Sequence, residues 1–305
     1  AVLLSLPALA HAEKDRPAGK PKASTFIRIE RDKDDKPQTL QTAVVHHRAS
    51  KKGAVVDLVA AVHVGDKAYF DALNKRLDEY DVVLYELVAP KEAAVPRGGK
   101  RPIGDPVSML QEMTRSSLGL ESQVECIDYT KGHFVHADLS PDEMGEKMRE
   151  RGDNGLSVTL SVAADLIRHA NLQQEAADDE EEDVNPLSLL LDPAASEKMK
   201  LMMARQFSDP AAMEAGLGPT LQRMLIDDRN EAAMKVLRKQ IAQGHKRIAI
   251  YYGAAHMPDF QRRLAEEFEM RPAGVEWVDA WDLTTAAKAP PAANPLDELF
   301  KLLEP

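Results

Sequence analysis

Two apolar runs, each leading to a histidine, constrain this chain more than any other feature. Residues 55–62 and 248–252 are rich in valine, isoleucine and tyrosine, a composition typical of buried strands. His63 follows the first run directly, and His256 follows the second after Gly-Ala-Ala. The sequence therefore predicts two buried strands, each of which delivers a histidine to one end of a sheet.

The segment after His63 predicts a crossover to a parallel strand. A Gly-Asp pair suits a turn and a helix start, and an apolar stripe at helical spacing follows, formed by Tyr69, Phe70, Leu73 and Leu77. Residues 82–85 are again strand-like and lead to Glu86. Strands joined by a crossover helix lie parallel, and ligands bind outside their carboxyl ends. One rim of the sheet should therefore bring together His63, Glu86 and His256.

These elements predict an α/β fold with a central mixed, largely parallel sheet flanked by helices. A strand at 39–49 should pair with the strand that begins at Val55, and further strands are predicted at 123–129 and 275–281. Between the two strand and histidine motifs, residues of about 140–245 show helical periodicity. They predict a helical insertion.

Two helix starts are marked inside the insertion. Ser140 is a capping residue, Pro141 suits the first helical position, and Glu143 completes a capping box. A second helix should open at residues 227–228 and end at Gly244. Its first turn then contains an arginine, which the helix dipole disfavours there. That misfit predicts a specific acidic partner for Arg229, and Glu86 is the obvious candidate.

Composition divides the chain into segments. The first twelve residues, AVLLSLPALAHA, form an apolar run ending in Ala-His-Ala, which signal peptidase accepts, and the run is too short to span a bilayer. We expect a signal-peptide remnant at 1–12 and an exported protein, periplasmic or secreted, with no transmembrane segment in the mature chain. The other predicted segments are a linker at 13–38, the α/β domain at 39–285, and a Pro/Ala linker with an amphipathic tail at 286–305.

Charge and cysteine content limit the partners. The net charge of −11 argues against a nucleic-acid-binding surface, which needs a basic face. The amphipathic tail suits docking on the body or on another subunit, so self-association is left open. Cys126 is the only cysteine, so no intrachain disulfide forms, and we expect it to be a small buried hydrophobe in a strand.

The rim residues suit metal chemistry. Two neutral imidazoles and a carboxylate form a common minimal site for a divalent transition metal such as manganese, cobalt or zinc. Such a metal lowers the pKa of bound water and polarises a carbonyl oxygen, so hydrolysis at neutral pH becomes feasible. Arg229 or a spare carboxylate would serve as oxyanion clamp or base. The plainer alternative is that both histidines close their strands by hydrogen bonding to loop backbone.

The remaining histidines carry weaker signals. His46 and His47 are neighbours in a strand and face opposite sides, so they are interpreted as structural. His133, His136 and Asp138 look like a metal cluster, but no second group of ligands is nearby. Metal binding, contact with a substrate cleft and a structural role all stay open for them.

Four short motifs together resemble the TraB/GumN family, which includes the Tiki proteins. The first is Ala60-Ala61-Val62-His63, and the others are Tyr85-Glu86, Arg229-Asn230 and Gly253-Ala254-Ala255-His256. They match the family's GxxH motif, strand-terminal glutamate, Arg-Asn helix motif and second GxxH motif. The match spans roughly residues 39–283.

The resemblance implies a fold akin to the erythromycin-esterase and ChaN-like group and a metal-dependent peptidase or hydrolase activity on a peptide or protein substrate. It implies metal ligands at His63, Glu86 and His256, and catalytic roles for Glu86, Arg229 and Asn230. Ala60 departs from the pattern because the family has glycine there, so a methyl group could crowd the site.

Two other readings stay open. One is a haem or iron binding protein without turnover, although haem pockets favour aromatic residues, which make up only 5% of this chain. The other is a signalling or interaction protein with a vestigial site, which the Ala60 departure motivates.

Overall fold

The computed structural model describes residues 26–49, 53–88, 118–153, 157, 161, 195–209 and 218–284. The expected signal-peptide remnant and the expected tail at 286–305 lie outside the described residues. Within the described ranges, no helix is both long and apolar enough to cross a membrane.

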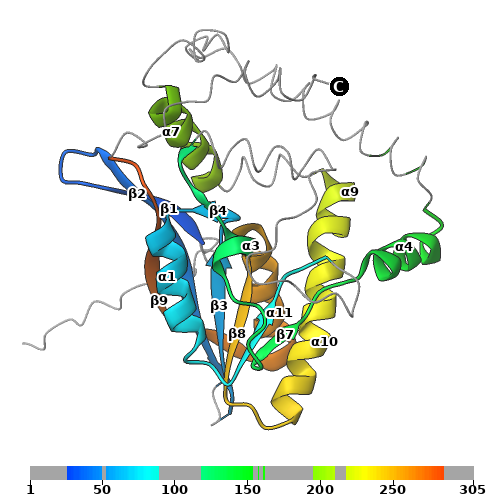
Figure 1. The fold of residues 1–305 in the computed structure, drawn as a ribbon. Helices are drawn as coiled ribbons and strands as arrows, with labels where there is room; N and C mark the ends of the chain where they lie inside the picture. Colours follow the sequence, from blue (N-terminus) through cyan, green and yellow to red (C-terminus); the bar gives the residue numbers. More distant parts are fainter. Residues whose placement is uncertain are drawn as a thin grey trace, which may run out of the picture.

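A seven-stranded mixed sheet forms the centre of the protein and confirms the predicted α/β class (Figure 1). Four strands are parallel, in the spatial order β3 (Val55–Ala61), β8 (Arg247–Gly253), β5 (Val82–Tyr85) and β7 (Phe134–His136). Three antiparallel strands extend the sheet beyond β3. The first, β2 (Pro37–Ala49), pairs with β3. The other two, β1 (Ile27–Arg31) and β9 (Met270–Asp282), both pair with β2. A second sheet has two short strands, β4 (Val64–Gly65) and β6 (Glu121–Ser122).

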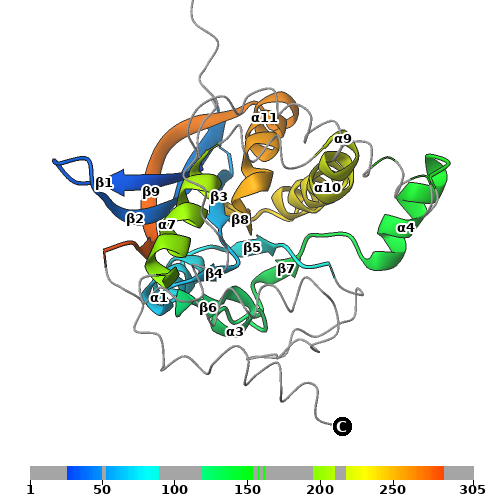
Figure 2. The ribbon, with the colours of Figure 1, turned by 90° about the horizontal axis from the view of Figure 1, so that it is seen from above.

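Helices cover both faces of the sheet. Seen from above, α1 (Lys67–Leu77) and α3 (Gln123–Cys126) lie on one side, and α10 (Asp228–Ala242) and α11 (Met257–Phe268) lie on the other (Figure 2). The predicted stripe of α1 is buried, since Tyr69, Phe70, Leu73 and Leu77 are each at most 1% exposed. Gly65 precedes this helix at a place where a Cβ atom would lie 2.8 Å from the Tyr69 ring, so a larger residue does not fit.

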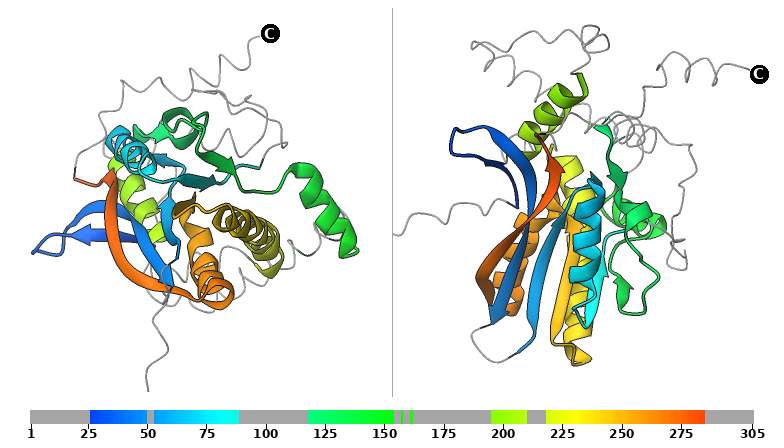
Figure 3. Two further views of the ribbon diagram at one scale, coloured as in Figure 1. Left: turned by 90° about the horizontal axis from the view of Figure 1, so that it is seen from below. Right: turned by 60° about the vertical axis from the view of Figure 1, so that its left-hand side comes forward.

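The order of the strands brings the motifs together. β3, α1 and β5 form the predicted crossover unit, but β3 and β5 are not neighbours, because β8 lies between them and pairs with both. After the insertion, the chain therefore adds β8 between the two strands of the crossover unit, β3 and β5 (Figure 3). As a result, the carboxyl ends of β3, β8 and β5 lie side by side at one rim.

Helices of the predicted insertion are present at its start and end. α4 (Pro141–Glu150) has the predicted capping box: Glu143 N–H donates to Ser140 Oγ at 3.2 Å, and Ser140 N–H donates to the Glu143 carboxylate at 2.9 Å. α7 (Ala195–Ser208) packs near β1, and its Phe207 ring meets Trp281 edge-on.

The predicted helix start at residues 227–228 is wrong. α9 (Pro219–Gln222), the π-helical turn η1 (Arg223–Asp227) and α10 form one continuous helix. Asp227 has helical backbone angles and no capping hydrogen bond from its side chain. The predicted end is confirmed, because α10 stops at Ala242 and Gly244 has a φ of 94°.

Two further predictions need correction. The predicted linker at 13–38 extends too far, because residues 27–31 form β1 and pair with β2. The strand predicted at 123–129 is instead the single turn α3, and the next strand along the chain is β7. Cys126 therefore lies in a helical turn and is only half-buried. The apolar run there was too short to distinguish a turn of helix from a strand.

Candidate functional site

Glu86 is the centre of the rim, where the chain leaves β5. Its Oε2 accepts the backbone N–H of Gly253, at the end of β8, at 2.7 Å. Its Oε1 accepts a hydrogen bond from Arg229 Nη2 at 2.7 Å and lies 3.5 Å from His256 Nε2. The Glu86 side chain is 10% exposed, so nearly all of its interactions are with protein. We use the term rim for His63, Glu86, Asp138, Arg229, Asn230 and His256.

The surroundings of Glu86 keep its carboxylate ionised. Burial by itself raises the pKa of Glu86, but hydrogen bonding and charge from His256, together with the charges of Arg229 and His63, hold this pKa well below its ordinary value. A carboxylate with such a low pKa is a poor general base and a good ligand for a cation. The low pKa therefore argues against the base role for Glu86 and leaves the ligand role.

His256 is oriented by Asn230. The Asn230 amide nitrogen donates to the His256 carbonyl at 3.0 Å and to Asp259 Oδ2 at 2.9 Å, so the amide oxygen must face His256 Nδ1, which lies 2.6 Å away. Nδ1 therefore carries a hydrogen, and Nε2 points toward Glu86. Asn230 is 0% exposed and acts by orienting the imidazole.

Arg229 has the predicted acidic partner, Glu86, but the helix dipole does not explain the pairing. The expected conflict with the helix dipole does not arise, because η1 and α9 precede Arg229. Its guanidinium contacts two acids, Glu86 and Asp138, and donates Nη1 to the Leu225 carbonyl at 3.3 Å. With these donors engaged and the residue 8% exposed, the guanidinium serves as an internal counter-ion, and the geometry does not favour the oxyanion-clamp role.

Asp138 is the rim residue that sequence reasoning left without a role. Its carboxylate accepts from Arg229 Nε at 3.0 Å and from Nη2 at 2.6 Å, and its side chain is 0% exposed. It follows β7, the parallel strand next to β5. Residues just beyond the carboxyl end of a parallel strand are expected at the rim, so Asp138 could have been assigned there. The sequence did not predict β7, however, and the assignment was missed.

His63 reaches the rim without contacting Glu86. It is exposed, and it forms no side-chain hydrogen bond or ion pair within the described residues, while its carbonyl accepts the Gln123 N–H at 2.9 Å. Its charge nevertheless contributes to the low pKa of Glu86, so the two groups are near enough to interact electrostatically. Across the described part of the chain, no three histidine, cysteine or acidic side chains form a ready-made metal cluster.

The donor atoms of Glu86 and His256 nevertheless fit a cation. With one hydrogen on Nδ1, His256 directs Nε2 at the ionised Oε1 of Glu86 at 3.5 Å, and a second hydrogen on Nε2 makes the two side chains an ion pair. A cation that displaced this second hydrogen would meet two acceptors, Nε2 and Oε1. An imidazole oriented through Nδ1 by a hydrogen-bond acceptor is also the usual arrangement of a metal-ligating histidine.

The two glycine-type motif positions differ in their surroundings. A Cβ atom at Gly253 would lie 3.3 Å from Glu86 Oε2, so glycine allows the close approach of the carboxylate. Ala60 is 0% exposed within β3, where it pairs with Tyr252, one residue before Gly253. The Ala60 methyl group is therefore buried within β3 and makes none of the contacts described for Glu86.

Among the described residues, His133, His136 and Asp138 do not come together as a metal site. His133 Nε2 bonds to the Leu77 carbonyl at 3.2 Å, and His136 Nε2 bonds to the Leu87 carbonyl at 2.6 Å. The two imidazoles thus hold different backbone segments. His136 fixes the chain immediately after Glu86.

A second cluster of charges lies near the amino end of β3, and we call it the lateral cluster: His46, Asp57, Arg76, Tyr80 and Glu276. His46 stands between two acids, with Nδ1 at 2.9 Å from Asp57 and Nε2 at 2.9 Å from Glu276. Tyr80 donates to Asp57 at 2.7 Å, and Arg76 pairs with Glu276. The structural role predicted for His46 suits this bridging position between three strands.

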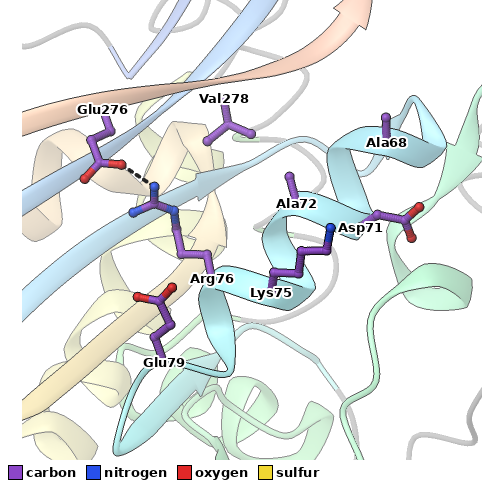
Figure 4. Close-up of a pocket in the computed structure, with 8 residues that line it drawn as sticks. All are labelled: Ala68, Asp71, Ala72, Lys75, Arg76, Glu79, Glu276 and Val278. Carbon is purple, nitrogen blue, oxygen red and sulfur yellow. Dashed lines mark hydrogen bonds and ion pairs between the residues drawn. The ribbon is translucent and has the colours of Figure 1, made fainter.

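Beside the lateral cluster is an open groove of about 800 Å³ between α1 and β9 (Figure 4). Ala68, Ala72 and Val278 form its apolar part, and Arg76 extends across it toward Glu276. None of its lining residues belongs to the rim, so this hollow and the candidate chemistry are separate.

Comparison with known proteins adds no relative. No family model, curated protein or solved structure matches the chain significantly. The interpretation of the rim therefore depends on its geometry and on the sequence motifs.

Proposed function

We propose that this protein is a metal-dependent hydrolase whose site is the rim. The observation that carries the proposal is that Glu86 Oε1 and His256 Nε2 are each separately oriented and face each other at 3.5 Å, so that a metal ion displacing the hydrogen on Nε2 would meet an oxygen and a nitrogen ligand. Glu86, His256 and the nearby His63 would hold a divalent transition metal such as manganese, cobalt or zinc. When bound, that metal would lower the pKa of a water molecule and polarise a carbonyl oxygen.

The chain's own residues prepare the site in three ways. Gly253 N–H and Arg229 fix the Glu86 carboxylate, and His256 together with Arg229 keeps it ionised. Asn230 fixes the ring of His256 and its tautomer. His63 is exposed, and an exposed imidazole at the rim is free to turn toward a bound substrate or ion.

Peptide bonds are the proposed substrate class, and this part of the proposal rests on the resemblance to the TraB/GumN family. Action outside the cytoplasm rests on the apolar residues 1–12. The low pKa of Glu86 supports a ligand role for it, so the base that accepts a proton from water is left to another group.

The proposal is tested by isothermal titration of manganese, cobalt and zinc into the pure protein, its His63→Ala and His256→Ala variants, and a matched His133→Ala control. We expect one site in the wild type and the control, with binding lost in His256→Ala and weakened in His63→Ala. A peptide library should then be cleaved only with metal present. Equal binding in all four proteins would reject the rim as the metal site.

A further inference from the structure

Asp138 determines how Arg229 can approach Glu86. Its two oxygens accept from Nε and Nη2 of Arg229, so one whole edge of the guanidinium is held by Asp138. The N–H of Leu139 donates to Asp138 Oδ1 at 2.7 Å and fixes the carboxylate against its own backbone. Because the Asp138 side chain is 0% exposed, water does not compete for these bonds.

Glu86 consequently receives a single hydrogen bond from Arg229. Nη2 donates to Oε1 at 2.7 Å, while Nη1 is directed to the Leu225 carbonyl. A guanidinium that is free to turn pairs with a carboxylate through two parallel hydrogen bonds. With this single bond, no arginine donor lies between Oε1 and His256 Nε2, which is 3.5 Å away.

We propose that Asp138 is a positioning residue that keeps Arg229 from pairing with both oxygens of Glu86, and thereby keeps Glu86 available to a divalent cation. The consequence for metal binding rests on the proposed function. The geometric part does not, because it concerns only Asp138, Arg229 and Glu86. Without the Asp138 charge, Arg229 would turn toward Glu86 and compete with the cation for its oxygens.

The first experiment is the Asp138→Asn variant, studied by crystallography and by manganese titration. We expect two Arg229 nitrogens within hydrogen-bond distance of Glu86 where there is now one, and an affinity for manganese about 10- to 100-fold weaker than that of the wild type. The matched control is Asp228→Asn. Asp228 is the neighbouring residue on α10 and pairs with Lys147 and Arg151, so its loss should leave manganese affinity unchanged.

A second variant separates positioning from general damage to the fold. Asp138→Asn combined with Arg229→Gln removes the guanidinium that competes for Glu86, so it should bind manganese at least about tenfold more tightly than Asp138→Asn alone. A purely structural role predicts the reverse, because two buried changes would damage the site more than one. Should Asp138→Asn fail to fold, the double variant and Arg229→Gln alone should bind equally, since Asp138 then has no guanidinium to position.

The outcomes distinguish this inference from the proposed function. If the wild type binds no manganese, cobalt or zinc, the proposed function fails, and the crystal structure of Asp138→Asn alone decides the inference. If Arg229 keeps a single bond to Glu86 in that structure, the inference is overturned. It is also overturned if the wild type binds metal and Asp138→Asn binds it equally well.

Discussion

The rim and the lateral cluster both place a histidine beside a carboxylate, but they differ in the partners of the two imidazole nitrogens. In the lateral cluster, both nitrogens of His46 lie 2.9 Å from an acid, so the imidazole is saturated. At the rim, His256 Nδ1 donates a hydrogen bond to the neutral amide of Asn230, and Nε2 lies 3.5 Å from Glu86. His46 is thus held by an acid on each nitrogen, whereas His256 has an acid on Nε2 alone.

The largest effect expected concerns the two glutamates. Glu86→Gln should weaken metal binding by at least about 100-fold, or roughly 3 kcal/mol, because it removes the charge of a proposed ligand. Glu276→Gln, the corresponding change in the lateral cluster, should alter affinity less than about twofold. Titration of manganese into both variants makes the comparison. A similar loss in both would show that the two regions do not differ in metal binding.

Asp57 should be important for stability and not for metal binding. It is 6% exposed and accepts from both Tyr80 and His46. Asp57→Asn should lower the free energy of unfolding by about 2 kcal/mol, since a buried charge-assisted bond is lost. Urea unfolding measures this loss, and metal titration of the same variant should match the wild type. Loss of metal binding at full stability would contradict the proposed division of roles.

His46 should make stability depend on pH. Burial, the largest influence, lowers its pKa, but hydrogen bonds and charges from Asp57 and Glu276 outweigh it and raise the pKa above the ordinary 6.5. The stabilisation is therefore fully present below about pH 6.5 and is lost as pH rises through the folded pKa. The wild type should exceed His46→Gln in unfolding free energy by about 1 kcal/mol at pH 6 and by less at pH 9. Urea unfolding of both proteins at the two pH values tests the sign.

The smallest effect concerns the alanine at the first motif. Ala60→Gly should leave metal affinity unchanged and cost about 0.5 to 1 kcal/mol of stability, because glycine weakens a strand interior. Gly253→Ala should instead weaken metal binding, since its methyl group would press on Glu86 Oε2. Improved metal binding in Ala60→Gly would revive the reading of a decayed site.

The sequence predicted the parts of the fold that depend on local pattern. The buried strands, the stripe of α1 and the cap at Ser140 are all present, because apolar periodicity and capping act within a few residues. It failed at residues 123–129 and at the helix start near 227, where short runs fit two structures equally well. At the rim, Glu86 was predicted to meet His63, His256 and Arg229; it contacts His256 and Arg229, whereas His63 forms no hydrogen bond or ion pair with it.

By itself, the sequence determined the periodicities of the strands and helices and the residue types available for chemistry, because both are properties of short stretches. Only the tertiary structure decided that β8 lies between β3 and β5, that Asp138 holds Arg229, and that His256 has an acid on Nε2 alone while His46 has one on each nitrogen. These outcomes depend on contacts between residues far apart in the chain, where packing and charge pairing select one arrangement among many that local pattern allows.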